Sequence, residues 1–258
     1  SCAGATTGLW RHAIESAMAS RSAVLVTGGA GFIGSELTVQ LVAAGHHVVV
    51  LDNLTTGRRE NLDGLPVDQL RLVVADLRDG DLVAALLREA SISTVFHLAC
   101  INLRRALAAP REAHDVNATA TLDLLIAARA AGVDRFVHVS SSEVYGTAQG
   151  VTIAENHPTR PTTTYGASKL AGDAYARAFW ETDAFPTVVV RPFNSFGPRA
   201  HHEGTSGEVI PRFLLRALAG RPLVVFGDGR QTRDFTYVTD TARGILLGQQ
   251  AGVFLEGA

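Results

Sequence analysis

Short apolar runs alternate along the chain with longer stretches of helical periodicity. The runs predict strands at 23–27, 47–51, 70–75, 94–99, 135–140 and 187–191. Between them, the pattern predicts helices at 32–44, 81–90, 118–131 and 165–180. Apolar runs without polar alternation are typical of parallel strands that are covered on both faces. The sequence therefore predicts an α/β fold, a doubly wound Rossmann sheet with right-handed crossovers.

The pattern changes after Pro192, where glycine, proline and histidine cluster at 197–211. A helix at 209–219 and a short strand at 223–226, which meets the turn 227–229, are predicted beyond it. We therefore divide the chain into an N-terminal extension (1–21), a Rossmann domain (22–192) and a smaller C-terminal lobe (193–258), interleaved with the Rossmann domain. Ligands of such folds bind outside the carboxyl ends of the strands.

Composition and charge exclude several function classes. The formal net charge is −2 and basic residues form no cluster, which argues against a nucleic-acid-binding surface. No apolar run approaches the roughly 18 residues of a membrane span, and residues 1–21 do not resemble a secretory signal. The cysteines, Cys2 and Cys100, are too few for a disulfide framework. We expect a cytoplasmic protein in which Cys100 is a buried residue and not a reactive thiol.

A glycine-rich loop follows the first predicted strand and opens the first predicted helix. Its glycines at 28, 31 and 34 have the spacing of a dinucleotide fingerprint. Glycine allows the backbone to approach a pyrophosphate, and the helix N-terminus offers N–H groups to the phosphates. Asp52 ends the second strand at about the expected distance and is suited to accept bonds from ribose hydroxyls. Because an acid there disfavours a 2′-phosphate, the predicted cofactor is NAD.

Tyr165 and Lys169 are spaced i, i+4 at the start of a predicted helix and so share one face. A free tyrosine has a pKa near 10, but an ammonium group and an oxidised nicotinamide ring nearby would favour the phenolate. Tyr165 is therefore a candidate general base. Ser141 ends the fifth strand and is placed to hydrogen-bond the same substrate oxygen.

Together these motifs resemble the extended short-chain dehydrogenase/reductase family. The resemblance rests on the segment 27–34, His97-Leu98-Ala99, Asn117, the segment 140–146, Tyr165 to Lys169, and Arg191 to Asn194. They occur in the order and spacing of the nucleotide-sugar epimerases, dehydratases and decarboxylases of that family. The match extends over about residues 23 to 247.

The resemblance implies a role for individual positions. Ser141, Tyr165 and Lys169 match the family's catalytic residues, and Tyr165 and Lys169 also contact the cofactor. Other cofactor positions are Gly28, Gly31, Phe32, Ile33, Gly34, Asp52, Asn53, Asp76, Leu77, Leu98, Ala99, Asn117 and Phe193. Ser142, Asn194, Val209, Phe226 and Arg233 match substrate positions, with Asn194 and Arg233 at the diphosphate and Val209 and Phe226 around the base. For Arg233 the sequence agrees, because a guanidinium binds a diphosphate well.

All activities of this group begin when the tyrosine takes the proton of the sugar 4-hydroxyl and a transient 4-keto sugar forms. Dehydratases place an Asp-Glu pair after the catalytic Ser or Thr, whereas this chain has Ser142-Glu143, which argues against 4,6-dehydration. Glu143, a further candidate catalytic residue, resembles the UDP-glucuronate decarboxylases. The segment 52–57 resembles the 4-epimerases. The prediction is a 4-epimerase of a UDP-hexose or UDP-hexuronic acid, with decarboxylation as the alternative and a non-catalytic NAD-binding protein as a third.

The resemblance also implies partners. The substrate is expected to be a nucleotide-diphosphate sugar, with UDP as the favoured nucleotide, and two copies form a homodimer through helices 118–131 and 165–180. The resemblance further implies a longer substrate lobe than the residues after Gly248 provide. No metal site is predicted: His201, His202 and Glu203 are adjacent, and adjacent histidines rarely bind one ion, so a loop near the sugar or a subunit contact is favoured.

Overall fold

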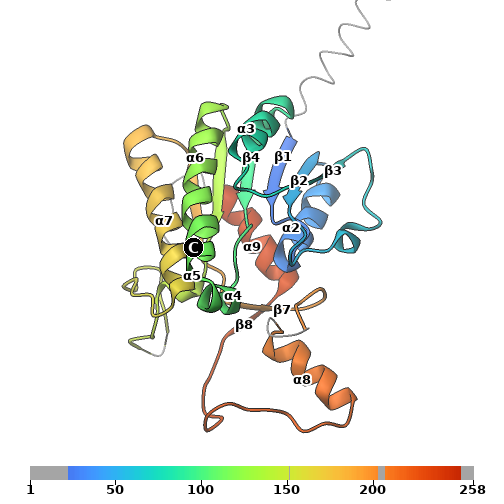
Figure 1. Ribbon diagram of the computed structural model, residues 1–258, viewed down its shortest axis with the longest axis vertical. Coiled ribbons are helices and arrows are strands. Elements are labelled where there is room, and N and C mark those ends of the chain that lie inside the picture. Colours follow the sequence, from blue (N-terminus) through green and yellow to red (C-terminus); the bar gives the residue numbers. More distant parts are fainter. Residues whose placement is uncertain (1–22, 151, 203–206, 251–258) are drawn as a thin grey trace, which may run out of the picture.

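The computed structural model describes residues 23–150, 152–202 and 207–250. Its core is a parallel sheet in the order β3-β2-β1-β4-β5-β6 (Figure 1). The strands are β1 (Ala23–Thr27), β2 (Val48–Asp52), β3 (Leu70–Val74), β4 (Ile92–His97), β5 (Arg135–Val139) and β6 (Thr187–Val190). The strand order reverses between β1 and β4, where doubly wound folds open a crevice for a ligand. The predicted Rossmann fold is confirmed.

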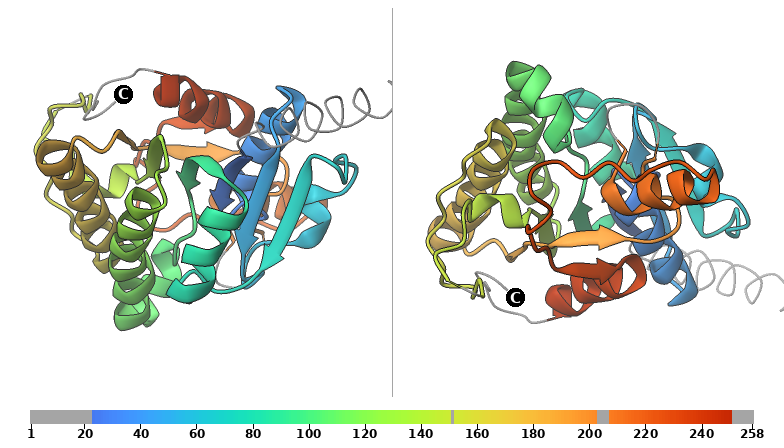
Figure 2. Two further views of the ribbon diagram at one scale, coloured as in Figure 1. Left: turned by 90° about the horizontal axis from the view of Figure 1, so that it is seen from above. Right: turned by 90° about the horizontal axis from the view of Figure 1, so that it is seen from below.

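Helices cover both faces of the sheet (Figure 2). A hydrophobic core lies on each face. Val24 and Val26 of β1 pack on one face with α2 (Phe32–Ala43) and α9 (Val238–Gln250). Leu25 packs on the other face, which is covered by α3 (Gly80–Glu89) and α6 (Ala120–Ala130), with α7 (Thr164–Asp183) beside α6. Because both faces are buried, successive residues of each strand must be apolar, which explains the continuous runs.

The segment between β4 and α6 is more structured than the sequence predicts. It contains α4 (Leu103–Ala108), α5 (Pro110–His114) and a π-helical turn (Asp115–Thr119) that runs directly into α6. The Asn102 side chain caps α4 by accepting a bond from Arg105 N at 3.1 Å. Two single turns of 3-10 helix, Arg59–Leu62 and Ser142–Val144, follow β2 and β5. These short elements lie at the carboxyl edge of the sheet, where they shape the ligand crevice.

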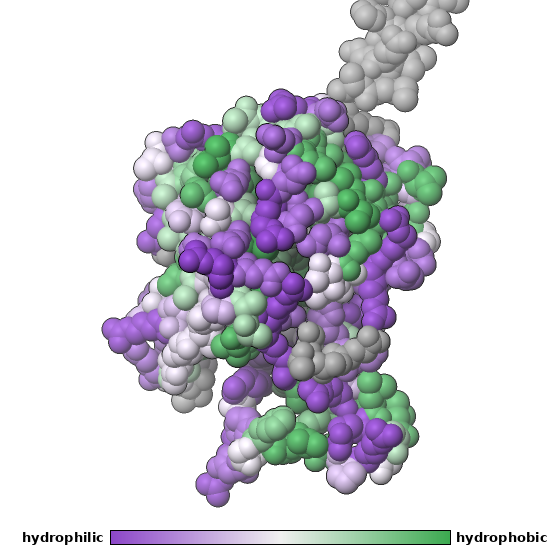
Figure 3. Space-filling view, in the orientation of Figure 1, coloured by the Kyte–Doolittle hydropathy of each residue, from purple (hydrophilic) through white to green (hydrophobic). Residues whose placement is uncertain are grey.

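The C-terminal part forms a second, two-stranded parallel sheet of β7 (Asn194–Phe196) and β8 (Phe235–Tyr237), with α8 (Val209–Leu218) between them in sequence. The strand predicted at 223–226 is wrong, since this segment has no regular structure in the described residues. Its aliphatic composition suits a strand, but a strand also needs a hydrogen-bonding partner. Side chains of this segment and of α8 are exposed, and apolar residues gather at the bottom of Figure 3.

After β8 the chain returns to the Rossmann sheet, because α9 packs against α2 and buries Ala242 and Ile245. The division of the chain at 192 stays a prediction. The predicted extension 1–21 lies outside the described residues. In the described part of the chain, no helix combines the length and the apolar character needed to cross a membrane.

The turn from β1 to α2 is packed so closely at two positions, Gly28 and Gly34, that each admits only glycine. A Cβ on Gly34 would lie 2.1 Å from the carbonyl oxygen of Gly28. Gly28 itself has φ +71°, and a Cβ there would lie 2.7 Å from the Ala99 nitrogen. The first turn of α2 therefore lies directly on the backbone of the turn that follows β1.

Replacing Gly34 by alanine is expected to lower the free energy of unfolding by more than about 2 kcal/mol, because backbone atoms must move to admit the methyl group. The matched control is Gly244→Ala in α9, where an added Cβ meets no atom within 4 Å. This exposed helical position should gain roughly 0.5–1 kcal/mol from the better helix former. Urea unfolding without cofactor measures both. Equal changes for the two variants would contradict the packing argument.

Candidate active site

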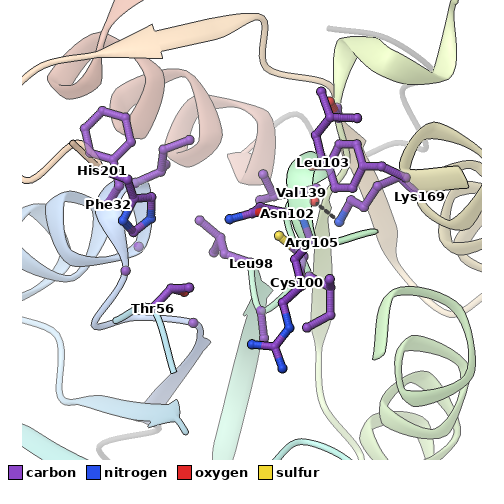
Figure 4. A pocket seen from close by; sticks show the side chains of 18 of the residues that line it. Phe32, Thr56, Leu98, Cys100, Asn102, Leu103, Arg105, Val139, Lys169 and His201 are labelled. Atoms are coloured by element: carbon purple, nitrogen blue, oxygen red, sulfur yellow. Dashed lines mark hydrogen bonds between the residues drawn. The ribbon is translucent and has the colours of Figure 1, made fainter. Parts of the chain in front are cut away.

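A cavity of about 640 Å³ opens at the carboxyl ends of the strands. Its wall is built from the loops after β1, β2, β3, β4 and β5, the start of α7, and residues 192–196, 201 and 207–210. Figure 4 shows Phe32 and His201 on one side and Lys169 and Val139 on the other. This volume lies in the range of cofactor and small-molecule sites.

One end of the cavity is the glycine loop, and its wall includes Gly28, Gly31, Phe32, Ile33 and Gly34. No side chain caps the N-terminus of α2, and its first turn contains no acidic residue. The helix therefore presents backbone N–H groups and its positive end to the cavity. These features fit the pyrophosphate of a dinucleotide.

Asp52, the last residue of β2, lies beside this loop and is only 8% exposed. Its carboxylate accepts bonds from Ala30 N at 3.0 Å and from Leu54 N at 2.8 Å. A Cβ on Gly57 would lie 2.7 Å from either carboxylate oxygen, so the segment after β2 folds tightly over it. The carboxylate is thus fixed in the cavity wall, as an acceptor of ribose hydroxyls requires.

The loop after β3 contributes Asp76 and Leu77, both of which line the cavity. The Arg78 side chain donates two bonds to Asp76, at 2.9 and 2.8 Å, and the Arg78 backbone N donates another at 2.9 Å. Asn53 Nδ2 donates a further bond at 3.4 Å. The hydrogen bonds and charge of Arg78 hold the pKa of Asp76 well below its ordinary value. Asp76 therefore keeps its negative charge. The adenine contact of Leu77, which is only 7% exposed, stays a prediction.

The segment after β4 contributes Leu98 and Ala99, whose position is fixed by a bond from Ala99 N to Thr27 Oγ1 at 3.2 Å. Asn117 is placed differently, because it is fully buried and does not line the cavity. Its amide bonds the backbone of Ile101 at both ends, at 2.7 and 3.0 Å, and Ser168 Oγ at 3.0 Å. The structure thus gives Asn117 a supporting position behind the cavity wall, joining the loop after β4 to α7.

The start of α7 lies directly on the turn after β5, which brings the candidate catalytic residues together. A Cβ on Gly166 would lie 2.5 Å from the backbone oxygen of Glu143, so glycine permits this contact. Ser141 Oγ accepts a bond from Glu143 N at 3.2 Å and caps the short helical turn. Ser141, Ser142, Glu143, Tyr165 and Lys169 all line the same cavity.

Burial governs the electrostatics of this wall. It raises the pKa of Tyr165 well above its ordinary value, and the neighbouring Cys100 and Glu143 add to the rise, whereas a hydrogen bond with Ser141 opposes it. Burial likewise lowers the pKa of Lys169, against the effect of Cys100 and Asp173. The Lys169 ammonium group donates to the Val139 carbonyl oxygen at 2.7 Å (dashed line in Figure 4).

The predicted substrate residues are only partly brought together. Ser142, Asn194 and Val209 line the cavity, as does Phe193, a predicted cofactor residue. Phe226 and Arg233 do not line it: Phe226 is 76% exposed, and Arg233 bonds the backbone of Thr232 at 2.7 Å. Both lie in or next to the irregular segment after α8, and their substrate roles stay predictions.

Several residues in the cavity wall were not predicted from the sequence as site residues. Cys100 was expected to be buried, but it is exposed and lines the cavity, because β4 ends at His97 and the chain turns there into the crevice. The wall also includes Arg104, Arg105, His201 and Glu208. Burial raises the pKa of Glu208 to about 7. Arg104 and Arg105 could have been recognised from the sequence, because they follow a predicted strand and so lie at the carboxyl edge of the sheet.

Asp52→Asn is expected to weaken NAD binding by about tenfold and to narrow the preference for NAD over NADP, since a charged acceptor for ribose hydroxyls is lost. Calorimetric titration with each dinucleotide measures both effects. The matched control is Asp63→Asn, an exposed aspartate at the end of a nearby helical turn, which should bind like the wild type. An unchanged NAD to NADP ratio in Asp52→Asn would refute the assignment.

Known proteins are similar to this chain over most of its length. The model of the NAD dependent epimerase/dehydratase family matches residues 24–253. A UDP-glucose 4-epimerase of Mycolicibacterium smegmatis is 42% identical over 219 residues, which are 84% of this chain and 69% of that protein. The relatives also include dTDP-glucose 4,6-dehydratases and a UDP-glucuronic acid decarboxylase.

Solved structures are similar over most of the chain. A UDP-N-acetylglucosamine 4-epimerase from Methanobrevibacter ruminantium M1, in complex with UDP-N-acetylmuramic acid, has a TM-score of 0.85 and 33% identity, covering 92% of this chain and 74% of that one. The UDP-glucose 4-epimerase of Thermus thermophilus, a complex with NAD, has a TM-score of 0.80 and 36% identity, covering 91% and 75%. These matches confirm the predicted cofactor and the resemblance to nucleotide-sugar enzymes. The chain belongs to the NAD dependent epimerase/dehydratase family.

Proposed function

We propose that this chain is a nucleotide-sugar 4-epimerase that acts on a UDP-linked hexose or hexuronic acid. The observation that carries the proposal is the composition of the catalytic wall, where Ser141, Tyr165 and Lys169 are complete and a serine, Ser142, stands beside Glu143. Loss of water across C5–C6 needs an acid and a base side by side. A hydroxyl at 142 does not supply the acid, so the 4-keto sugar would be reduced again and not dehydrated.

Each of the catalytic residues in the cavity wall has its own role at the sugar. Tyr165 accepts the proton of the 4-hydroxyl, and Ser141 hydrogen-bonds the same oxygen. The Lys169 ammonium stabilises the phenolate by its charge, at a site where burial otherwise opposes ionisation. When bound, NAD supplies the acceptor and later donor of the hydride. Inversion then requires the keto sugar to present its other face before Tyr165 returns the proton.

The nucleotide half of the substrate would lie against residues 192–196 and 207–210, which form part of the cavity wall. Asn194 and Val209 are the predicted contacts that line it. A UDP group is proposed because the relatives that are similar over most of this chain include enzymes named for UDP-sugars. The predicted homodimer through α6 and α7 also stays a proposal.

One observation favours a second candidate, a UDP-glucuronate decarboxylase. Glu143 lines the cavity and is close enough to Tyr165 to affect its pKa. A carboxyl group at this position suits proton transfer during loss of carbon dioxide from a 4-keto uronate. The same glutamate has no necessary role in moving a hydride between the two faces of C4.

A product assay distinguishes the candidates. The protein is incubated with NAD and, separately, with UDP-glucose and UDP-glucuronate, and the products are separated by chromatography and identified by NMR. The C4 epimer of either substrate supports the proposal, whereas a UDP-pentose from UDP-glucuronate replaces it with the decarboxylase. Tyr165→Phe should reduce turnover by about 10²–10⁴-fold while NAD binding remains. No product from either substrate refutes both candidates and favours a non-catalytic NAD-binding protein.

Glu143→Gln tests the same choice within the site. In a 4-epimerase the variant should retain turnover within about threefold, because the amide keeps the shape and the catalytic Ser, Tyr and Lys are intact. A decarboxylase should lose about 10²-fold or more, the usual effect of removing a general acid or base. The kcat on each substrate is the measurement. A large loss of epimerisation would show that Glu143 takes part in it.

A further inference from the structure

A cluster of charged and polar side chains is buried between α7 and the strands β5 and β6, behind the catalytic wall. Asp173 lies one helical turn after Lys169 and on the same face of α7. Asp173 is 4% exposed and Lys169 1%, while His138 of β5 is fully buried and Arg191, after β6, is 6% exposed. Of these four, only Lys169 lines the cavity. The other three have no assigned part in the reaction.

Asp173 joins the members of this cluster. Arg191 Nε donates to Asp173 Oδ2 at 2.9 Å, and Arg191 Nη1 donates to the Tyr145 hydroxyl at 3.2 Å. The other carboxylate oxygen, Oδ1, lies 3.4 Å from His138 Nε2. Neither Oδ1 nor the ring nitrogens of His138 have a hydrogen-bond partner within the described structure. One of the two oxygens of the Asp173 carboxylate, Oδ1, therefore accepts no direct hydrogen bond.

The histidines of the cluster do not supply a charge. A Cβ on Gly172 would lie 2.6 Å from His138 Nε2, so glycine at this position lets the ring pack against α7. His138 lies 5.6 Å from His97, centroid to centroid. Burial lowers the pKa of both histidines, and the charge of Lys169 lowers them further. Both rings are thus neutral at physiological pH.

Within the buried cluster, one carboxylate lies near Lys169. The titratable groups that face Lys169 are Cys100 and His97 at the end of β4, His138 on β5, and Tyr165 and Asp173 on its own helix. Burial alone would raise the pKa of Asp173, but His138 and Arg191 more than offset it, so the pKa lies below its ordinary value. Asp173 is the carboxylate of this set, and its charge, like the effect of Cys100, raises the pKa of Lys169.

We propose that Asp173 is a positioning residue that keeps Lys169 positively charged and fixed against the end of β5. A buried ammonium group is costly unless an anion lies close to it. Asp173 supplies that anion from the protein interior, so that the cavity side of Lys169 stays free for Tyr165 and the cofactor. Arg191 holds the carboxylate in place and cannot itself lose its proton.

The sequence provides a direct test, because lysine occurs only once in the 258 residues, at position 169. Protein labelled with [ε-¹³C]lysine gives a single ε-methylene signal, whose chemical shift reports protonation. In Asp173→Asn the titration midpoint of this signal is expected to fall by about one pH unit or more relative to the wild type. The matched control is Asp183→Asn at the other end of α7, where the ion pair with Arg129 is at the surface. It should leave the midpoint unchanged.

An equal midpoint in Asp173→Asn and the wild type overturns the proposal. So does a wild-type signal that is already that of the neutral amine at pH 7, and this measurement needs no variant to fold. Asp173→Glu preserves the charge and should keep the midpoint near that of the wild type. A merely structural role for Asp173 would lower the melting temperature of Asp173→Asn without moving the lysine titration.

The catalytic consequence rests on the proposed function. If Lys169 loses its proton earlier, the alkaline limit of the kcat profile should move to lower pH in Asp173→Asn by the same shift as the NMR midpoint, with the substrate KM nearly unchanged. An unshifted kcat profile alongside a shifted lysine signal would show that the charge of Lys169 does not limit turnover. Absence of turnover in the wild type would refute the proposed function and leave the lysine titration as a separate result.

Discussion

The close approach of three backbone segments at Gly28 is the constraint on which the rest of the site depends. The first turn of α2 lies on the carbonyl of Gly28. The chain leaving β4 passes close to the α-carbon of Gly28 at Ala99. No side chain fits between them. Because α2 starts so near the sheet, its N-terminus faces the crevice between β1 and β4, and Asp52 lies within reach of the same loop through Ala30. The cofactor end of the cavity follows from this contact.

The sequence predicted the Rossmann sheet well, because each of its strands is buried on both faces and so carries a continuous apolar run. The glycine loop and Asp52 were recognisable for a similar reason, since each is a local pattern with one physical cause. The helical turns between β4 and α6 were missed because their short length gives little periodicity. The run at 223–226 has the composition of a strand, but composition does not supply a hydrogen-bonding partner.

Contacts between distant parts of the chain account for what the sequence could not show. Cys100 was expected in the core, yet its exposure depends on where β4 ends and not on its apolar neighbours. Asn117 matched a cofactor position by resemblance, whereas its amide is used by Ile101 and Ser168 behind the wall. The pairing of Asp173 with Arg191 and His138 joins a helix to two strands. Such an arrangement exists only after the sheet and α7 have packed.

The irregular segment after α8 has a consequence for the behaviour of the protein in concentrated solution. Residues 223–226 are aliphatic or aromatic, carry no charge and expose between 45% and 76% of their surface. Such a run outside any sheet can add to a strand of another molecule and so promote aggregation. Arg221 and Pro222 directly before it, and Gly227 after it, are residues of the kind that limit such pairing. The residues on either side of this segment therefore oppose self-association through it.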